Sequence, residues 1–294
     1  MSLAQARTAP ASLQYLRDLL LLAKPRLSTL VLVTASGGLA LAPGRIGVAR
    51  AVLTLLGTAA VVGAANALNN FIEREIDARM RRTRERPLPA GRVEPFVALG
   101  LGIAIPLFAI PMLAQVANRL TAFLALVAIV TYVLVYTPMK QRSTLALFVG
   151  AVPGAIPPLM GWTAVTGRID AGGLALFSLL FFWQLPHFLA VSMYLKEDYA
   201  RGGLRVFALV HGDERTKRWI VATTLALLPA SLALLPLGLA GPGYAIVAAA
   251  SGAALLLFAL RGLRRRESTR WARSFFLATL LHLTILFAAL LAGQ

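Results

Sequence analysis

The chain contains no cysteine, only three histidines and few charged residues, which make up 14% of its 294 positions. The absence of cysteine excludes disulfide frameworks, thiolate zinc sites and cysteine nucleophiles. Soluble domains of this length carry about 25% charged residues, whereas 58% of this chain is hydrophobic. The hydrophobic residues also lie in long blocks. We therefore expect an integral membrane protein rather than a soluble one.

Long stretches without a charged residue predict the membrane crossings. A helix needs about 20 apolar residues to cross roughly 30 Å of hydrocarbon. The 42-residue stretch 219–260 is too long for one crossing, and Gly241-Pro242-Gly243 is a turn signal that divides it into a helical hairpin. The sequence therefore predicts an all-α, polytopic fold with nine transmembrane helices, which fall in residues 27–44, 51–72, 95–118, 120–139, 143–167, 171–195, the two halves of 219–260, and 274–294.

The basic residues predict the orientation of these helices. Nine crossings place the termini on opposite sides of the membrane, and the side that holds the N-terminus receives 25 of the 29 lysines and arginines. The other four are Arg45, Arg50, Arg119 and Arg168. Because cytoplasmic loops are the basic ones, the N-terminus is predicted to be cytoplasmic. The net charge of +17 is then a sign of membrane orientation, and no nucleic-acid partner is expected.

The predicted domain organisation is simple. Residues 1–26 form a cytoplasmic N-terminal segment, in which residues 12–24 are apolar but too short to span and are expected to form an interfacial helix. Nothing before residue 27 resembles a cleaved secretory signal. Residues 27–294 form a single intramembrane domain, because no loop reaches forty residues and none can hold a soluble domain.

The inner end of the second span carries the first polar motif. Asn69, Glu73 and Asp77 are spaced four residues apart and therefore lie on one face of a helix. Two carboxylates one turn apart repel each other unless a cation lies between them, and their hard oxygen atoms suit Mg²⁺ together with a substrate phosphate. The arginine-rich segment 79–86 follows directly, and guanidinium groups bind phosphate oxygens well. The alternative is a helix end with solvated charges, but polar groups inside a span are costly and are usually functional.

A second polar motif closes the sixth span. Gln184 and His187 lie within a stretch that has no charged residue, and Asp198 follows eleven residues after His187. His187 and Asp198 would share one face if the helix continued, because eleven residues are about three turns. A second acidic site facing the first could hold another Mg²⁺ or complete a clamp on a diphosphate. Judged from its neighbours alone, a histidine such as His187 more often has a structural role than a ligand-binding one.

Lys140 and Arg142 lie between the two motifs, on the same predicted inner side. They could close over a phosphate, although membrane orientation accounts for them equally well. The span that follows, 143–167, contains several prolines and glycines. Such helix breakers are tolerated in a membrane where they line a cavity or pack closely against a neighbour.

Taken together, the motifs resemble those of intramembrane prenyltransferases of the UbiA type. Within that superfamily the chain is most similar to the protohaem IX farnesyltransferases, or haem O synthases. The spacing of Asn69, Glu73 and Asp77 is typical of the whole superfamily, whereas PPLMGW and WQLPHF are specific to the haem branch. The resemblance covers nearly the whole chain and rests on the segments KPR (24–26), NNFIEREIDARMRRTRERPLPAG (69–91), YTPMKQRSTL (136–145), GAIPPLMGWTAVTG (154–167), FWQLPHFLA (182–190), EDY (197–199) and HGDERTKR (211–218).

This resemblance implies nine helices around a central cavity, in a bacterial inner membrane, with the acidic motifs at the cytoplasmic mouth of the cavity. It implies Mg²⁺ as the cofactor, with Glu73, Asp77 and Asp198 as its ligands. The first motif would be Asn69, Glu73 and Asp77, and Asp198 would form the second. The residues that it implies for substrate binding are Arg82, Arg86 and Lys140 for the diphosphate, His187 for haem contact, and Gln184 and Tyr199 beside them.

The reaction implied by the resemblance joins two lipid-soluble substrates. A farnesyl group would pass from farnesyl diphosphate to a vinyl group of haem B, and addition of water would give haem O for terminal oxidases. Metal and basic side chains would neutralise the leaving diphosphate, and an apolar cavity would keep water from the allylic cation. The implied partners are farnesyl diphosphate, haem B, the lipid bilayer, and haem A synthase or terminal-oxidase assembly proteins.

The chain departs from the pattern of the haem branch at four places. Glu73 stands where aspartate is usual, and Ala146 where asparagine is common. Residues 204–207, LRVF, replace a Pro-Met-Leu-Pro run, and Gly202 stands where a second acidic residue is expected. Three alternatives are therefore open: a prenyltransferase for a quinone-precursor ring or another tetrapyrrole, a transporter or flippase that uses the carboxylates as ion sites, and a non-catalytic haem carrier.

Overall fold

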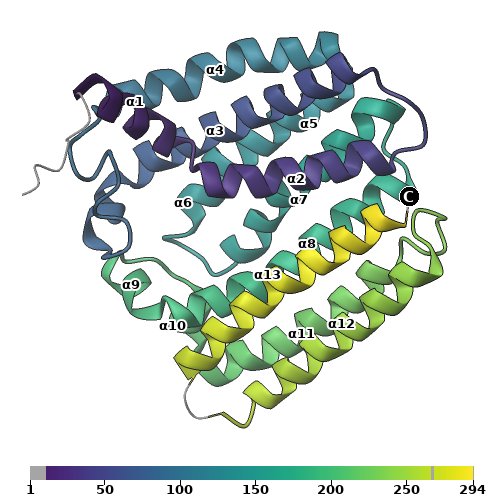
Figure 1. Cartoon of the computed structure of the whole chain (residues 1–294). Helices are drawn as coiled ribbons and strands as arrows, with labels where there is room; N and C mark the ends of the chain where they lie inside the picture. The colour runs from purple at the N-terminus through teal and green to yellow at the C-terminus, as the bar shows by residue number, and fades with distance from the viewer. Residues whose placement is uncertain (1–10, 266–267, 294) are drawn as a thin grey trace, which may run out of the picture.

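Helices and the turns between them make up the computed structural model, which describes residues 11–265 and 268–293; no β-strand occurs in these ranges. The predicted all-α fold is therefore confirmed. Residues 1–10 of the predicted N-terminal segment and residue 294 of the last predicted span lie outside the described residues. The helices (Figure 1) are α1 (Ala11–Leu22), α2 (Pro25–Leu41), α3 (Val48–Arg79), α4 (Pro95–Val116), α5 (Arg119–Val130), a π-helical stretch (Thr131–Tyr136), α6 (Thr137–Met139), α7 (Ala146–Thr166), α8 (Ala171–Tyr194), α9 (Lys196–Arg201), α10 (Phe207–His211), α11 (Asp213–Leu232), α12 (Pro242–Gly262) and α13 (Ser268–Ala292).

The helix ends follow local signals in the sequence. Pro25, Pro95 and Pro242 occupy the first turns of α2, α4 and α12, where a proline costs no helical hydrogen bond. Asn118 caps α5 by accepting a 2.9 Å hydrogen bond from a backbone N–H of the first turn. The predicted turn before Pro242 separates α11 from α12, so the hairpin within the 42-residue stretch is confirmed.

Within the described ranges, seven helical segments are long and apolar enough to cross a membrane: α3, α4, the run from α5 to α6, α7, α8, α12 and α13. The pair α1–α2 is bent by 49° and would make an eighth crossing. The remaining predicted span matches α11, whose first turns carry Arg215, Lys217 and Arg218. The fold is that of a multi-pass membrane protein, and nine crossings with a cytoplasmic N-terminus stay a prediction.

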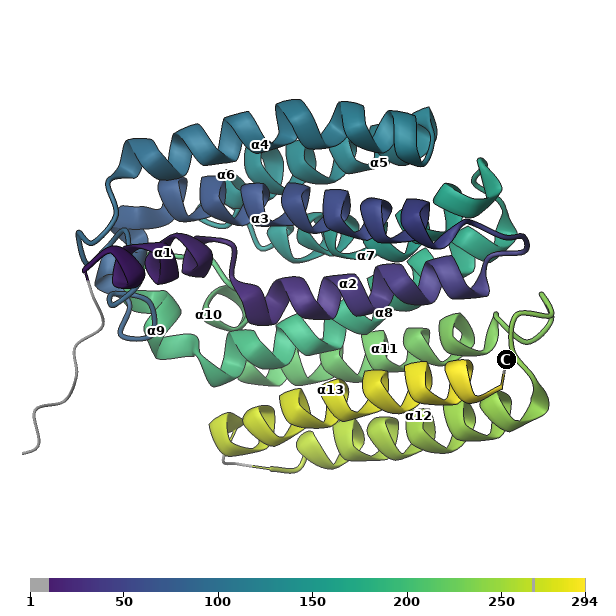
Figure 2. The same ribbon diagram turned by 45° about the horizontal axis from the view of Figure 1, so that its top comes forward.

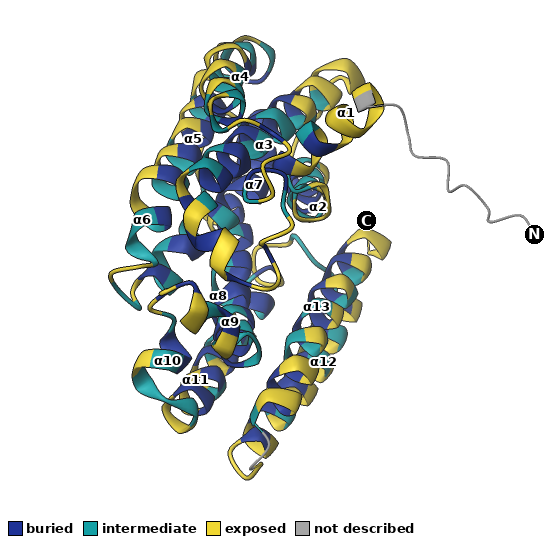
Figure 3. Cartoon of the chain, turned by 90° about the vertical axis from the view of Figure 1, so that its left-hand side faces the viewer, coloured by how far each residue is buried: buried dark blue, intermediate teal, exposed yellow. Residues whose placement is uncertain are grey.

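At the centre of the bundle lie α7 and α8 (Figure 2). They pack against each other; α7 also packs against α2 and α5, and α8 packs against α11 and α13. The pairs α3–α4 and α12–α13 lie on opposite sides of this centre. The helix faces that point outward are exposed and rich in leucine, with valine and isoleucine, while those that face the centre are buried (Figure 3). This distribution suits a protein surrounded by lipid.

Two glycines allow α2 and α7 to approach closely. A Cβ atom added to Gly38 would overlap the carbonyl oxygen of Pro158, and one added to Gly161 would overlap the carbonyl oxygen of Ala35. Close backbone approach of this kind is a common way for membrane helices to associate, because van der Waals packing takes the place of the hydrophobic effect there. The contact holds α2, and the bend that precedes it, against the central helices.

The polar loops gather at one end of the bundle, called here the polar end (Figure 1). It consists of residues 80–94, 140–145 and 195–212 with the adjoining helix ends. Because α3 has 32 residues, it is about 48 Å long at 1.5 Å per residue, and this exceeds the roughly 30 Å of the hydrocarbon layer. One end of α3 must project beyond that layer, and its last turns bring the first polar motif to the polar end.

Also at the polar end, α1 turns an apolar face outward. Leu13, Leu16 and Leu20 are more than half exposed, whereas Asp18 is buried. Arg92 donates hydrogen bonds of 3.0 and 3.1 Å to the Asp18 carboxylate, which ties α1 to the loop between α3 and α4. Hydrogen bonding from Arg92 also holds the pKa of Asp18 below its usual value. An anchored helix with an outward apolar face fits the predicted interfacial role of this segment.

Gly161→Ala is expected to destabilise the bundle, because the added methyl group overlaps a backbone carbonyl that can yield only if α2 shifts. Over-packing of this kind costs about 1–3 kcal/mol. Gly100→Ala in α4 is the matched control, since nothing lies within 4 Å of its added Cβ atom. The measurement is the unfolding midpoint of the detergent-solubilised protein, which Gly161→Ala should lower and Gly100→Ala should not. Equal midpoints for the two variants would contradict the close contact between α2 and α7.

Candidate active site

The last turns of α3 are unusually polar for a helix in an apolar bundle. Asn66, Asn69, Asn70, Glu73 and Asp77 are all buried, with exposed fractions of 5% or less. Buried polar groups of this kind are normally satisfied by hydrogen bonds or ion pairs. Their partners come from the bend before α2, the loop after α3 and the end of α6, so these side chains draw distant parts of the sequence together.

The bend between α1 and α2 is held by two of the asparagines. Asn66 donates a 3.2 Å hydrogen bond to the carbonyl oxygen of Ala23. Asn70 donates one of 3.0 Å to the carbonyl oxygen of Leu22. Lys24 follows with φ of 50°, the only left-handed backbone conformation of a non-glycine residue in the described ranges. Strained conformations persist where the surrounding structure holds them, and they cluster at functional sites.

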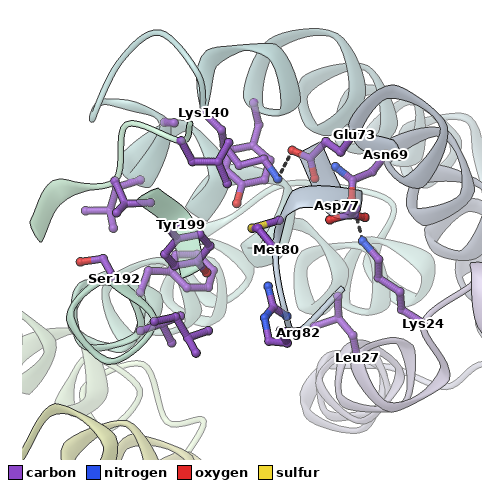
Figure 4. A pocket seen from close by; sticks show the side chains of 18 of the residues that line it. Lys24, Leu27, Asn69, Glu73, Asp77, Met80, Arg82, Lys140, Ser192 and Tyr199 are labelled. Carbon is purple, nitrogen blue, oxygen red and sulfur yellow. Dashed lines mark hydrogen bonds and ion pairs between the residues drawn. The ribbon is translucent and has the colours of Figure 1, made fainter. Parts of the chain in front are cut away.

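This bend directs Lys24 into the site (Figure 4). Its ammonium group donates a 2.6 Å hydrogen bond to Asn69 Oδ1, and the amide group of Asn69 donates one of 3.1 Å to Thr137 Oγ1. Burial lowers the pKa of Lys24 to about 7, and the positive charges of Arg86 and Lys140 act in the same direction. Sequence reasoning missed Lys24 as a site residue, because the letters KPR do not reveal the backbone conformation that turns the side chain inward.

Each carboxylate of the first motif is paired with a cation from the protein itself. Glu73 forms an ion pair with Lys140 (Figure 4), and Asp77 forms one of 2.6 Å with Arg86. These pairs relieve the repulsion expected between two carboxylates one helical turn apart. In the structure, Lys140 and Arg86, two of the predicted diphosphate partners, therefore form ion pairs with the predicted metal ligands.

Asp198 lies elsewhere than its spacing predicted. The helix α8 ends just before Leu195, where the backbone leaves the helical conformation, and the short α9 begins after it. The helix therefore does not continue from His187 to Asp198, so the condition for the predicted shared face is not met. Asp198 instead accepts hydrogen bonds from the backbone N–H groups of Arg81 and Arg82, at 2.7 and 3.3 Å. It thereby holds the first residues of the loop that follows α3.

A cavity of about 1070 Å³ lies among these segments. Its wall carries six basic side chains and two carboxylates, which leaves a surplus of positive charge and favours a polyanionic ligand over a free cation. Tyr199 also lines this cavity, and burial raises the pKa of its hydroxyl group. The charged side chains of the wall are Lys24, Arg26, Arg82, Arg86, Lys140 and Arg205, with Glu73 and Asp77.

Two tyrosines of the π-helical stretch complete the wall beside Lys140. The ring of Tyr136 lies 4.9 Å from the Lys140 ammonium nitrogen, and the hydroxyl group of Tyr132 lies 3.4 Å from Asn66 Oδ1. Segments of π-helix are rare and are frequent at functional sites. Sequence reasoning did not find these tyrosines, because no local pattern distinguishes a π-helical turn from an α-helical one; only the YTPMKQRSTL segment pointed to this region.

A smaller cavity of about 270 Å³ adjoins the first, and the two share lining residues that include Tyr132, Tyr136 and His187. Its other walls are mostly apolar and include two prolines of α7, as expected for helix breakers in a membrane protein. Gln184 lines only this smaller cavity, and its amide group donates hydrogen bonds of 3.1 and 3.0 Å to the backbone carbonyls of Ala151 and Leu180. Of the two predicted residues in α8, His187 is the one that borders both cavities.

The first motif has the donor chemistry that Mg²⁺ requires. Asn69, Glu73 and Asp77 present hard oxygen atoms to the larger cavity from one face of α3. Asp198, predicted as the third metal ligand, does not line that cavity. Among the described residues, no group of three histidine, cysteine or acidic side chains could hold a metal ion by itself. The residues therefore fit an ion that two carboxylates share with a bound phosphate, which is the usual arrangement for Mg²⁺.

Comparisons with known proteins agree on one family. Residues 31–281 match the UbiA prenyltransferase family. A protoheme IX farnesyltransferase of Anaeromyxobacter dehalogenans (strain 2CP-C) is 72% identical over 291 residues, which cover 99% of this chain and 98% of that protein.

Solved structures of low sequence identity share the fold. The structure of a digeranylgeranylglyceryl phosphate synthase has a TM-score of 0.80 at 15% identity and covers 95% of this chain and 98% of its own. A UbiA homolog from Archaeoglobus fulgidus, bound to DMAPP and Mg²⁺, has a TM-score of 0.70 at 17% identity, with coverages of 93% and 99%. The architecture of the bundle is therefore one that known UbiA proteins share.

Asp198→Ala is expected to loosen the loop that follows α3, because it removes the acceptor of two backbone N–H groups. Hydrogen bonds to a charged group contribute about 1.5–3 kcal/mol, so local opening should become about tenfold more frequent or more. Glu197→Ala is the matched control, since the Glu197 side chain is 91% exposed and its ion pair with Arg201 is 3.6 Å long. Hydrogen–deuterium exchange should rise in residues 80–86 of the first variant alone. Unchanged exchange in both variants would contradict this role of Asp198.

Proposed function

This chain is a member of the UbiA prenyltransferase family, and from that membership we propose that it transfers a farnesyl group from farnesyl diphosphate to a vinyl group of protohaem (haem B). The observation that carries the proposal is the pair of adjoining cavities, one with a surplus of positive charge and one mostly apolar. A diphosphate head and a long apolar chain are the two parts of a prenyl diphosphate. The acceptor and the chain length follow from the name of the relative that shares 72% of its sequence.

In this proposal the diphosphate binds at the polar end, among the cations of the larger cavity. Lys140 and Arg86 each pair with a carboxylate of the first motif. Both side chains line the cavity, so each can exchange its carboxylate partner for a phosphate oxygen. Lys24 and Arg82 supply further charge from the bend and from the loop after α3. Arginine and lysine side chains of this kind stabilise the charge that develops on a leaving phosphate.

Glu73, Asp77 and Asn69 are the residues proposed to hold Mg²⁺, which when bound would neutralise much of the charge on the leaving diphosphate. The geometry of the first motif supports this assignment, since its oxygen atoms face the same cavity as the cations. The predicted role of Asp198 as a third ligand is replaced in this proposal by a positioning role. Its contacts with the backbone of Arg81 and Arg82 support that change.

The proposed reaction breaks the C1–O bond of farnesyl diphosphate, the π bond of the vinyl group and an O–H bond of water, and it forms one C–C bond and one C–O bond. The bond between farnesyl C1 and the bridging oxygen breaks, and its electron pair leaves with the diphosphate. The terminal carbon of a haem vinyl group then bonds to C1, and the positive charge moves to the inner vinyl carbon. A water molecule adds its oxygen there and releases a proton, which gives the hydroxyethylfarnesyl group of haem O. The allylic cation must meet the vinyl group before it meets water, and the apolar walls near Phe188 and Trp183 favour that order.

The proposed location of the protein is a bacterial inner membrane. Residues 27–294 would form one intramembrane domain with nine crossings of a bacterial inner membrane, and the polar end would face the cytoplasm, as the basic residues predict. Both organic substrates would then enter from the bilayer, apart from the diphosphate head, which would remain at the aqueous surface. Haem A synthase or terminal-oxidase assembly proteins would receive the product.

The first test is extraction of haem from bacterial membranes that contain this chain, followed by chromatography with mass detection. A haem heavier by one farnesyl group and one hydroxyl group is expected with the unchanged protein. Asp77→Ala should abolish that product without preventing membrane insertion, because it removes a carboxylate of the first motif. Glu75→Ala is the matched control, since the Glu75 side chain is 75% exposed and pairs with its neighbour Arg74. Haem B alone, with the protein present in the membrane, would refute the proposed acceptor.

Lys24→Met should weaken the binding of farnesyl diphosphate without changing that of protohaem. Loss of a charge-assisted contact of about 1.5–3 kcal/mol corresponds to a KM for farnesyl diphosphate raised about ten- to a hundredfold. Lys24→Arg should keep part of the affinity, because the positive charge remains. Lys196→Met serves as the control, since Lys196 pairs with Asp213 at the same end of the bundle and does not line the cavity. A KM that Lys24→Met leaves unchanged would place Lys24 outside the diphosphate site.

A further inference from the structure

The basic side chains of the larger cavity form two groups. Three of them, Lys24, Arg86 and Lys140, are bound to side chains of the first motif. The other three make no hydrogen bond or ion pair through their side chains within residues 11–265 and 268–293; these are Arg26, Arg82 and Arg205. A guanidinium group on a cavity wall without a protein partner is free to bind an anionic ligand.

The diphosphate does not need all six of these side chains. In the proposed function it is received by Lys24, Arg82, Arg86 and Lys140 together with Mg²⁺. The charges of these groups are sufficient to balance the diphosphate and the two carboxylates of the first motif. Arg205 is then in excess, and an excess positive charge on a cavity wall favours a second anionic group in the same cavity.

The loop that carries Arg205 is fixed by its backbone. The N–H group of Arg205 donates a 2.9 Å hydrogen bond to the carbonyl oxygen of Lys140, and that of Leu204 donates one of 3.0 Å to the carbonyl oxygen of Tyr199. The side chain of Leu204 is buried against the end of α3. Arg205 lies between α9 and α10, on the opposite side of the polar end from α1 (Figures 1 and 3). It therefore reaches the cavity from a different side than Lys24.

The cavity wall next to Arg205 is apolar and aromatic. Val206 and Phe207 follow Arg205 directly and also line the cavity. Phe207 belongs to the same hydrophobic cluster as Tyr194 and Phe276, two other lining residues whose rings are stacked with 6.4 Å between their centroids. Aromatic side chains of this kind favour a flat apolar ligand. Arg205 is itself exposed, so its charge stands at the rim of this apolar wall.

These surroundings fit one of the two proposed substrates better than the other. A prenyl diphosphate carries its charge in a single group, which the cations at the first motif receive. The porphyrin acceptor has a flat apolar ring with two propionate groups at its edge, and both are ionised carboxylates at neutral pH. Arginine binds a carboxylate through two parallel hydrogen bonds, which gives the contact a defined geometry.

We propose that Arg205 binds a propionate carboxylate of the porphyrin acceptor at the rim of the larger cavity. This inference deepens the proposed function and rests on it, because the porphyrin is the proposed substrate. Arg205 lies in the segment 204–207, at which the chain departs from the pattern of the haem branch. The departure supplies a contact for the acceptor, and with it a means of selecting porphyrins whose propionates are free.

The direct test compares the binding of protohaem with that of its dimethyl ester, in which both propionates are esterified. The purified full chain is held in nanodiscs of phosphatidylcholine, and binding is followed by quenching of tryptophan fluorescence. Arg205→Gln should weaken protohaem binding about tenfold, because a charge-assisted pair is lost. It should leave the affinity for the ester unchanged, since the ester cannot form the pair. Equal effects on the two ligands, or no effect on either, would overturn the proposal.

Two further variants serve as references. Arg205→Lys should bind protohaem with an affinity between those of the unchanged protein and Arg205→Gln, because it keeps the charge and loses the paired hydrogen bonds. Arg215→Gln is the matched control, since Arg215 is exposed at the same end of the bundle and does not line the cavity. It should leave both affinities unchanged.

Two other ligands for Arg205 can be distinguished by the same variants. Arg205→Gln should raise the KM for protohaem and leave the KM for farnesyl diphosphate unchanged. A raised KM for farnesyl diphosphate alone would place Arg205 at the diphosphate and overturn the proposal. An effect of Arg205→Gln that appears only when the nanodiscs contain phosphatidylglycerol would assign the side chain to a lipid head group, which would also overturn it.

Haem extraction separates a failure of this inference from a failure of the proposed function. Formation of farnesylated haem by a protein whose protohaem binding is unaffected by Arg205→Gln would overturn the propionate contact and leave the proposed reaction standing. A preference for free propionates that depends on Arg205, in a protein that forms no farnesylated haem, would support the contact and refute the reaction.

Discussion

Charged side chains in an apolar bundle must be paired, and this requirement shapes the whole polar end. Glu73 and Asp77 are buried on one face of α3 and receive their counter-charges from Lys140, after α6, and Arg86, in the following loop. An unpaired charge in such surroundings costs several kcal/mol. The Glu73–Lys140 pair therefore also joins segments that are far apart in the sequence, and the Asp77–Arg86 pair holds the loop that follows α3. Asparagines of the same helix do the same for the bend at Lys24.

These pairs are suited to exchange as well as to stability. A lysine or arginine that is paired with a carboxylate can exchange that partner for a phosphate oxygen and stay paired. The carboxylate stays paired as well, provided that another cation binds to it. The surplus of positive charge on the cavity wall makes the larger cavity favourable for an anion even before any such exchange. In the proposed function, folding and substrate capture would therefore depend on one set of contacts.

Much of the fold and part of the candidate site could be predicted from the sequence, and each wrong or missing prediction has a physical cause. Charge-free stretches located the long helices, and Gly241-Pro242-Gly243 located the hairpin, because hydrophobic length and turn residues act locally. The spacing of Asn69, Glu73 and Asp77 placed them on one helical face for the same reason. The position of Asp198 could not be predicted because no residue near Leu195 signals the end of α8. Lys24 and the π-helical tyrosines were missed because their positions depend on backbone conformations that tertiary contacts impose.

The two cavities differ in the polarity of their walls, and this difference bears on where the bonds of the substrates would break and form. The larger cavity is lined by six basic side chains together with apolar residues such as Phe207 and Phe276, whereas, among the described residues, no lysine, arginine or carboxylate lines the smaller one. The two cavities meet at Tyr132, Tyr136 and His187. A prenyl diphosphate bridges polar and apolar surroundings at its C1 atom, since the diphosphate lies on one side of it and the hydrocarbon chain on the other. In the proposed reaction, C1 would therefore lie at the boundary between the cavities.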